Sequence, residues 1–147
     1  MHILVATMAD APSIIDLLRR QLEEHAIVLS ADRLVAAVDA VFADVRRGVF
    51  LLAMNDATAI GISYVSFAWS IEYGGASARL EELYVLPRWR ARGVGTLLLQ
   101  ASIERATSSG CNVVDLEVQR GQERAGNLYA RHGFAQLPRT RWLKQLC

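Results

Sequence analysis

The stretch LEELYVLPRWRARGVGTLLL, residues 80–99, decides the fold. It begins as an apolar strand that ends at Pro87, passes through a turn with arginine and glycine, and opens a helix at Val94. Backbone N–H groups at a helix start have no intrahelical partner, so they carry partial positive charge and attract anions. Gly93 and Gly95 let a pyrophosphate approach the backbone closely. The stretch therefore predicts a site for a phosphate-bearing cofactor.

Two other phosphate-binding loops do not match these residues. A dinucleotide fingerprint requires a third glycine three positions after Gly95, where this sequence has Leu98. A P-loop requires Gly-Lys followed by Ser or Thr, and the chain contains no such tripeptide. The sequence thus excludes both loops.

The pattern Arg90-x-x-Gly93-x-Gly95 resembles the acyl-CoA pyrophosphate loop of the GNAT superfamily of N-acetyltransferases, which is Gln/Arg-x-x-Gly-x-Gly/Ala. In that family the preceding strand is splayed from the next one, and its free backbone groups pair with the pantetheine arm in the manner of an added strand. The resemblance implies that acetyl-CoA is bound by Leu83, Tyr84, Val85, Arg90, Ala91, Arg92, Gly93, Val94, Gly95 and Thr96.

A second segment, residues 122–134, looks like the family's Asn-x-x-Ala-x-x-Leu-Tyr-x-x-x-Gly-Phe motif. The chain departs from the motif at Gln122, where the family usually has the asparagine that contacts pantetheine. Glutamine keeps both a donor and an acceptor, so Gln122 stays a candidate for cofactor binding. The residues that match the motif are Ala125, Leu128, Tyr129, Gly133 and Phe134.

The resemblance also implies a catalytic pair. Acetyl transfer to an amine leaves CoA as a thiolate, and Tyr129 stands where many family members place the phenol that protonates it. The amine must first lose a proton, and Glu81 stands where enzymes that resemble spermidine acetyltransferase carry a glutamate. By strand alternation Glu81 shares a face with Leu83 and Val85, whereas Glu82 lies on the opposite face. Glu82 is the alternative base, or else a solvated surface residue.

Hydrophobic periodicity and turn residues predict an α/β protein with a mixed sheet, in the order β-α-α-β-β-β-α-β-α-β. This order matches the GNAT-like acyl-CoA N-acyltransferase fold over essentially the whole chain, and the length of 147 residues predicts a single domain, 1–147. We expect a loop at 69–77 with a Gly-Gly pair. The expected strands are 2–6, 49–54, 59–67, 80–86, 112–118 and 142–144, and the expected helices are 12–24, 30–47, 94–109 and 123–132.

Composition limits the class of protein. Hydrophobic residues make up 52% of the chain and charged residues 21%, which excludes disorder as the default state. No apolar run approaches the roughly 18 residues of a membrane span, and the N-terminus lacks the basic start of a secretion signal, so we expect a cytoplasmic protein without a membrane partner. Cys111 and Cys147 are too few for a disulfide scaffold, and no histidine stands at metal-ligand spacing to them.

Charge is distributed unequally along the chain. Residues 1–78 carry 5 basic and 9 acidic side chains, and residues 79–147 carry 11 and 6. The basic half suits a phosphorylated cofactor, and the acidic half favours a cationic acceptor. The overall charge of +1 is too neutral to indicate nucleic acid. Trp69 and Tyr73 could stack on an acceptor or lie in a homodimer contact.

The resemblance implies transfer of an acetyl group from acetyl-CoA to a primary amine of a small molecule or peptide, without a metal. Its alternative is a non-catalytic CoA-binding regulatory module of the same fold, although the presence of both Tyr129 and Glu81 favours catalysis. A third hypothesis is that the chain is a nucleotide-binding α/β protein. The acceptor-binding loops, 25–30 and 69–77, do not reveal which amine is used.

Overall fold

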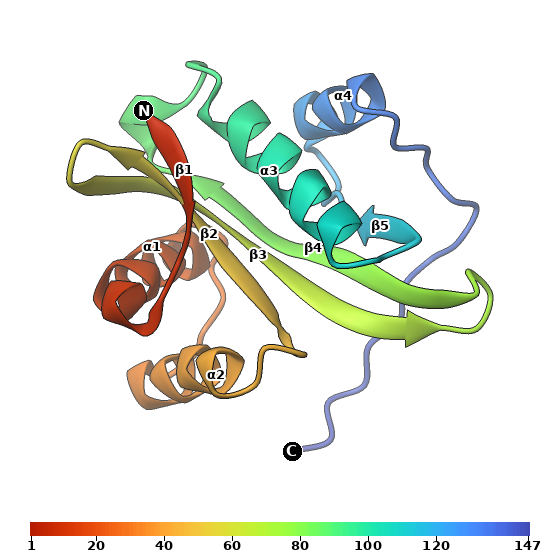
Figure 1. Ribbon diagram of the computed structural model, residues 1–147, viewed down its shortest axis with the longest axis horizontal. Helices are drawn as coiled ribbons and strands as arrows, with labels where there is room; N and C mark the ends of the chain where they lie inside the picture. Colours follow the sequence, from red (N-terminus) through yellow and green to blue (C-terminus); the bar gives the residue numbers. More distant parts are fainter. The chain divides into compact units, whose positions relative to one another are not determined.

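Five strands and four α-helices make up the computed structural model, which describes residues 1–147 (Figure 1). The chain divides into two compact units, Met1–Glu117 and Val118–Cys147. The second unit contains α4 (Glu123–Arg131). The first unit contains β1 (His2–Val5), α1 (Ala11–Glu24), α2 (Ala31–Ala43), β2 (Gly48–Asn55), β3 (Thr58–Ser70), β4 (Gly75–Val85), α3 (Val94–Ser108) and β5 (Val113–Leu116), with single 3-10 turns at Met8–Asp10 and Pro87–Trp89.

The five strands form one sheet in the order β1-β2-β3-β4-β5. The first three pairings are antiparallel, and β4 pairs with β5 in parallel, so the predicted mixed sheet is confirmed. Antiparallel neighbours are joined by short connections, whereas a parallel pair needs a crossover, and α3 provides it. The glycine turn therefore lies between β4 and the crossover helix.

Helices cover both faces of this sheet, and neighbouring residues of β3 show which helix covers which face. Ile62 belongs to the apolar cluster that includes α1 and α2 residues. Ser63 points the other way and lies 2.8 Å from Ser102 of α3, oxygen to oxygen. Ser102 donates its own hydroxyl to the Leu98 carbonyl, so Ser63 is the donor between the two serines and neither buried hydroxyl is left unpaired. Thus α1 and α2 cover one face and α3 the other.

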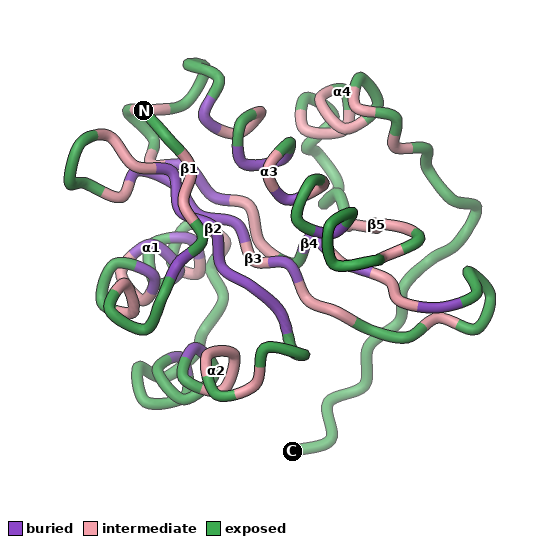
Figure 2. The backbone as a smooth tube through the Cα atoms, in the orientation of Figure 1, coloured by how far each residue is buried: buried purple, intermediate pink, exposed green.

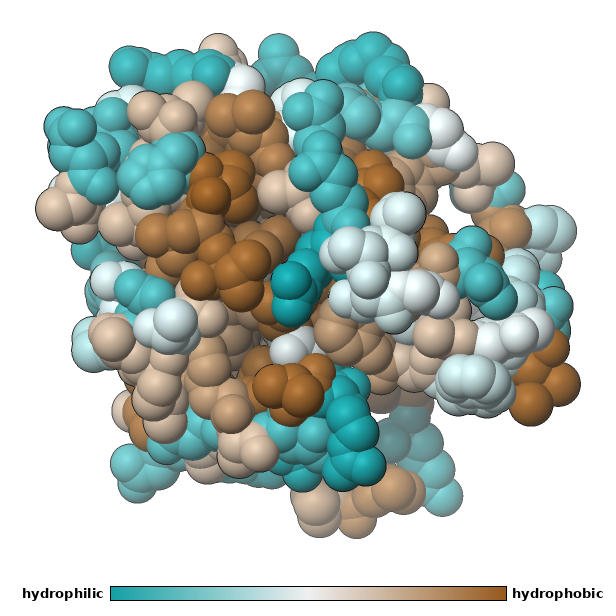
Figure 3. All heavy atoms as spheres, in the orientation of Figure 1, coloured by the Kyte–Doolittle hydropathy of each residue, from teal (hydrophilic) through white to brown (hydrophobic).

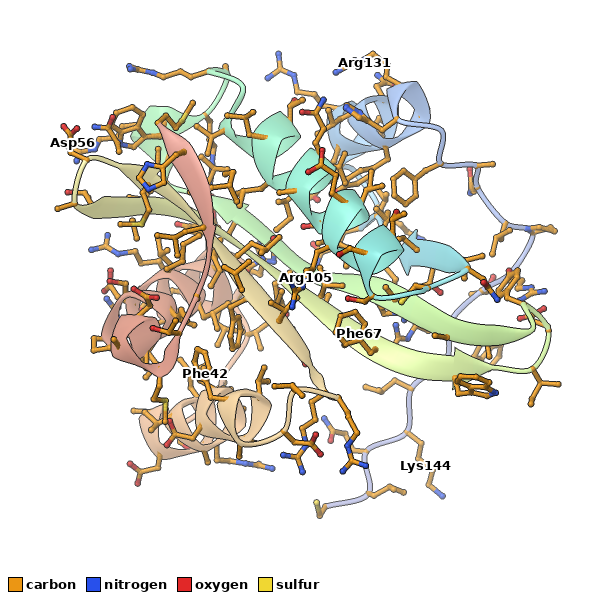
Figure 4. All side chains as sticks on the ribbon, viewed as in Figure 1. Phe42, Asp56, Phe67, Arg105, Arg131 and Lys144 are labelled. Atoms are coloured by element: carbon orange, nitrogen blue, oxygen red, sulfur yellow. The ribbon has the colours of Figure 1, made fainter.

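The core follows β2 and the middle of β3, where Figure 2 shows the longest run of buried residues. Phe42, labelled in Figure 4, reaches from α2 toward the sheet, and its ring centre lies 5.6 Å from that of Phe50. Phe50 in turn lies 4.9 Å from the ring of Tyr64 on β3. This aromatic row holds α2 against the sheet. At the sheet edge, Figure 3 shows further apolar side chains along β1, and Val5 there is exposed.

The contact between α3 and β3 depends on Gly61. A Cβ at Gly61 would lie 3.0 Å from Leu98 Cδ1, 3.1 Å from the Tyr84 carbonyl oxygen and 3.3 Å from Val94 Cγ1. These distances are shorter than ordinary van der Waals contact, so only glycine lets the first two turns of α3 approach the sheet this closely. The same contact fixes where α3 begins, and hence where its free amides lie.

Two expectations about strands were wrong. No strand forms at 142–144, where Trp142 and Leu143 are exposed, because an apolar run becomes a strand only when another strand supplies its hydrogen bonds. The expected loop at 69–77 is shorter, since β3 continues to Ser70 and β4 begins at Gly75. Pairing between β3 and β4 extends both strands up to the turn that the glycine pair predicted.

Among the helices of the structure, none has the length and apolar character of a membrane span.

Gly61→Ala should lower the free energy of unfolding by about 1–3 kcal/mol, the usual cost of overpacking a well-filled site. Gly126→Ala is the matched control, because an added Cβ there meets nothing within 4 Å and alanine suits the interior of α4. Denaturant unfolding of both variants measures the difference. Equal stability of the two variants would contradict the close contact between α3 and β3.

Candidate active site

The candidate site lies at the point where the pairing between β4 and β5 ends. The parallel pairing joins Ser77–Leu80 of β4 to Val113–Leu116 of β5 and ends there. Beyond Leu80, β4 pairs with β3 alone, through Glu82 to Val85. The expectation of a splayed strand is therefore confirmed at the level of strand pairing.

The register shows which backbone groups the splayed strand leaves unpaired. The Leu86 amide donates to the Ile60 carbonyl at 2.9 Å, so by antiparallel alternation Tyr84 and Glu82 also direct their backbone groups toward β3. Leu83 and Val85 direct theirs toward the open edge, as expected for residues that receive an added strand, although the Val85 carbonyl already accepts a hydrogen bond from Arg90. Tyr84 differs from its expected role, because its backbone is used within the sheet and its side chain is buried.

The glycine turn presents the start of α3 without obstruction. Gly93 precedes the helix with φ +84°, and a Cβ built on it meets nothing within 4 Å. A Cβ on Gly95 would meet only Val85 Cγ2, at 4.0 Å. The first helical hydrogen bond runs from the Leu97 amide to the Gly93 carbonyl, so the amides of Val94, Gly95 and Thr96 have no helical acceptor. These open amides and bare glycines fit a pyrophosphate.

The two arginines of the loop motif have different surroundings. Arg90 is bound on two sides, since its guanidinium forms two hydrogen bonds with Glu24 at 2.8 and 2.7 Å and its Nε donates to the Val85 carbonyl at 2.9 Å. Arg92 is exposed and lies over the Trp89 ring, with its guanidinium carbon 5.3 Å from the ring centre. Arg90 is exposed as well, but its charge is paired with Glu24, whereas Arg92 forms no ion pair and is the better placed of the two to meet an anion.

A β-bulge alters the two neighbouring glutamates. Tyr64 pairs with Glu82, but the next residue of β3, Val65, pairs with Leu80, so Glu81 is the extra residue. The expected alternation fails here: Glu81 Oε1 accepts a hydrogen bond from Ser66 at 2.9 Å, and Glu82 hydrogen-bonds with Gln21 of α1. Both carboxylates lie toward the face that α1 and α2 cover, so the prediction that they occupy opposite faces was wrong.

The bulge gives the two carboxyls different electrostatic surroundings. Burial, reinforced by the negative charge of Glu81, raises the pKa of the Glu82 carboxyl from 4.5 to about 7, and the hydrogen bond with Gln21 opposes this shift. Glu81 is exposed. Burial and the Glu81 charge also raise the pKa of the Tyr64 phenol. Glu82 is thus a carboxyl that changes protonation near neutral pH, a property that sequence alternation could not reveal.

The remaining predicted site residues, Gln122 and Tyr129, belong to the second unit. Gln122 immediately precedes α4, and Tyr129 lies within that helix, with its ring centre 5.9 Å from that of Phe134. Burial raises the pKa of the Tyr129 phenol, so the hydroxyl stays protonated at neutral pH. No group of three or more His, Cys, Asp or Glu side chains in the structure could hold a metal ion.

Comparison with known proteins agrees with this arrangement of strand edge, turn and helix. The family model described as the acetyltransferase (GNAT) family matches residues 12–134, which include parts of both units. The chain belongs to this family. The match includes the glycine turn and the segment with Tyr129, the two parts on which the resemblance was based.

Curated relatives within the family include named acetyltransferases. An L-methionine sulfoximine/L-methionine sulfone acetyltransferase of Pseudomonas paraeruginosa is 32% identical over 107 residues, which are 67% of this chain and 62% of the relative. A thialysine N-epsilon-acetyltransferase of Mus musculus is 32% identical over 57% of this chain and 49% of the relative. The chain thus spans about half to three fifths of the length of these relatives.

Solved structures show the same fold. Aminoglycoside N-acetyltransferase AAC(6')-Iy in complex with CoA has a TM-score of 0.84 at 22% identity, covering 99% of this chain and 95% of that one. An aminoglycoside 6'-N-acetyltransferase of Acinetobacter haemolyticus has a TM-score of 0.80 at 21% identity, covering 100% and 99%. At these identities the likeness establishes the fold.

A charge placed on the glycine turn tests the predicted pyrophosphate site. Gly93→Asp should weaken CoA binding about tenfold or more, because it adds a negative charge beside the open amides. Gly93→Asn is the matched control, since both side chains tolerate positive φ and only one is charged. Isothermal titration calorimetry with CoA gives both affinities. Equal affinities in the two variants would exclude a pyrophosphate from this turn.

Proposed function

We propose that the chain is an N-acetyltransferase that moves an acetyl group from acetyl-CoA to a primary amine. The observation that carries the proposal is Glu82, a half-buried carboxyl with a pKa of about 7 on the strand that leads into the glycine turn. Such a group suits a general base, whereas binding of CoA alone does not require one. Membership of the acetyltransferase (GNAT) family supports the same conclusion.

The cofactor is proposed to lie along the open edge of β4. The backbone groups of Leu83 and the amide of Val85 would pair with the pantetheine arm, and the amides of Val94, Gly95 and Thr96 would hold the pyrophosphate. Arg92, Ala91 and Gly93 would complete the turn around it, and Gln122 would add a side-chain contact. Acetyl-CoA supplies the acetyl group as a thioester.

We assign the base to Glu82 in preference to Glu81. A base for an amine works best when its pKa lies near the operating pH, and Glu82 meets this condition whereas Glu81 is exposed. Glu82 would take the proton from the amine, directly or through water, so that the nitrogen lone pair can attack the thioester carbonyl. Glu81 would act on Glu82 through its charge, because that charge helps to raise the pKa of Glu82.

The acid is proposed to be Tyr129. As the C–S bond breaks, its phenolic proton would pass to the departing sulfur and yield free CoA thiol. The raised pKa keeps this proton in place at neutral pH. The negative balance of residues 1–78 favours an acceptor that carries positive charge before it loses its proton.

The activity is tested by thiol release from acetyl-CoA in the presence of an amine panel. The panel takes L-methionine sulfone, thialysine and an aminoglycoside from the names of relatives and structural neighbours, and spermidine as a polyamine. Amine-dependent release of CoA thiol supports the enzyme. CoA binding without release on any amine of a broad panel would favour the regulatory module, and competition by ATP or NAD would favour a nucleotide-binding protein.

Glu82→Gln should lower kcat/KM at pH 7 by about 10²-fold, the usual scale for loss of a general base. In the unchanged protein kcat/KM should rise with pH through about 7, because Glu82 must lose its proton to act. Glu81→Gln should keep activity and shift this acidic limb to lower pH, since it removes a negative neighbour. Ionisation of the amine itself is common to all three proteins and cancels in the ratios. The opposite result, a 10²-fold loss only in Glu81→Gln, would return the role to Glu81.

Tyr129→Phe should lower kcat by roughly 10- to 10³-fold with little change in CoA affinity, because the phenolic proton matters mainly in the transition state. The ring and its contact with Phe134 stay in place. Steady-state kinetics on a confirmed amine, with calorimetry for CoA, give the two quantities. Unchanged kcat would mean that the thiolate leaves unprotonated or takes its proton from water.

A further inference from the structure

We propose that Arg90, the first residue of the loop motif, is a positioning residue that ties the glycine turn to the end of α1, and that it does not bind phosphate. The inference rests on the proposed CoA site, because it concerns how that site is held. The resemblance alone assigns Arg90 to the cofactor, so the structure changes the role of this residue.

All three guanidinium nitrogens of Arg90 donate a hydrogen bond within the protein, although 44% of the side chain stays exposed. Nη1 and Nη2 donate to the two carboxylate oxygens of Glu24 at 2.8 and 2.7 Å, and Nε donates to the Val85 carbonyl at 2.9 Å. The guanidinium carbon also lies over the Tyr84 ring, 5.5 Å from its centre. Such a two-pronged pairing fixes direction as well as distance.

The charges of Arg90 and Glu24 also argue against phosphate binding by Arg90. Glu24 neutralises Arg90, and its pKa is lowered chiefly by the hydrogen bonds from that guanidinium. A phosphate near Arg90 would therefore meet a neutral pair. An acidic residue at the end of a helix gains nothing from the helix dipole, so the favourable partner of Glu24 is Arg90, 66 positions away in the chain.

The position of the pair explains what it holds. Glu24 is the last residue of α1, Val85 is the last residue of β4, and Arg90 begins the turn before Gly93. One side chain thus fixes three segments that meet beside the open strand edge. It also occupies the Val85 carbonyl, so the backbone groups left at the edge are those of Leu83 and the Val85 amide. The loop 25–30, which follows Glu24 directly, is attached to the same point.

The sign of one mutational effect separates positioning from phosphate binding. If Arg90 were a phosphate ligand, Glu24→Gln would free its charge and tighten CoA binding. If Arg90 positions the turn, Glu24→Gln should weaken CoA binding, by roughly 3- to 10-fold for the loss of a charge-assisted pair. Arg90→Lys should do the same, because lysine keeps the charge but cannot reach both partners.

The matched control is Glu23→Gln, which removes the same charge one residue earlier. Glu23 pairs with Arg19 on the exposed side of α1, at 2.8 Å, so its loss should leave CoA affinity unchanged. Affinities are measured by calorimetry with CoA and no amine. Tighter or unchanged CoA binding in Glu24→Gln would overturn the proposal, as would an equal loss in Glu23→Gln.

A second measurement needs no cofactor. In the free protein the amides of Trp89 and Arg90 donate to Leu86 and Pro87 at 2.8 and 3.2 Å within the turn. Glu24→Gln should speed hydrogen exchange at these two amides and leave β2 unaffected, and Glu23→Gln should not. Unchanged exchange would overturn the positioning role. If the unchanged protein bound no CoA, the proposed function would fail, and this exchange experiment would still decide the role of Arg90.

Discussion

The constraint on which the site depends is the early end of the β4–β5 pairing. Backbone N–H and C=O groups must be satisfied, and in a sheet interior the neighbouring strand does this. After Leu80 the neighbour is gone, so Leu83 and Val85 offer hydrogen bonds along an open edge. The crossover helix begins a few residues later, and Gly61 lets it lie close against the sheet. The strand edge and the helix N-terminus both have backbone groups without hydrogen-bond partners, and both adjoin the same turn.

The bulge at Glu81 lies at the place where β4 loses β5. Its extra residue turns Glu81 and Glu82 toward one face, and the resulting charge repulsion adds to burial in raising the pKa of Glu82. Regular alternation would have put the two carboxyls on opposite sides of the sheet and removed this interaction. An irregularity of the backbone thus gives the strand a group that titrates near neutral pH.

The sequence predicted those parts of the fold that depend on local pattern. Apolar periodicity located all four helices within a few residues, and the Gly93 and Gly95 spacing located the turn. The predictions were wrong where residues far away in the sequence determine the local structure. Whether 142–144 forms a strand depends on a neighbour, the faces of Glu81 and Glu82 depend on a one-residue mismatch with β3, and the partner of Arg90 is 66 residues away. A single sequence carries no local signal for any of these three.

The central claim is that the open edge of β4 receives CoA as an added strand, and amide hydrogen exchange with and without CoA tests it most directly. In the free protein the amides of Leu83 and Val85 should exchange quickly, whereas that of Tyr84 is protected by β3. On addition of CoA, protection should increase at Leu83 and Val85 and stay unchanged at Tyr84. Protection that appears elsewhere, with Leu83 and Val85 unaffected at saturating CoA, would contradict this account.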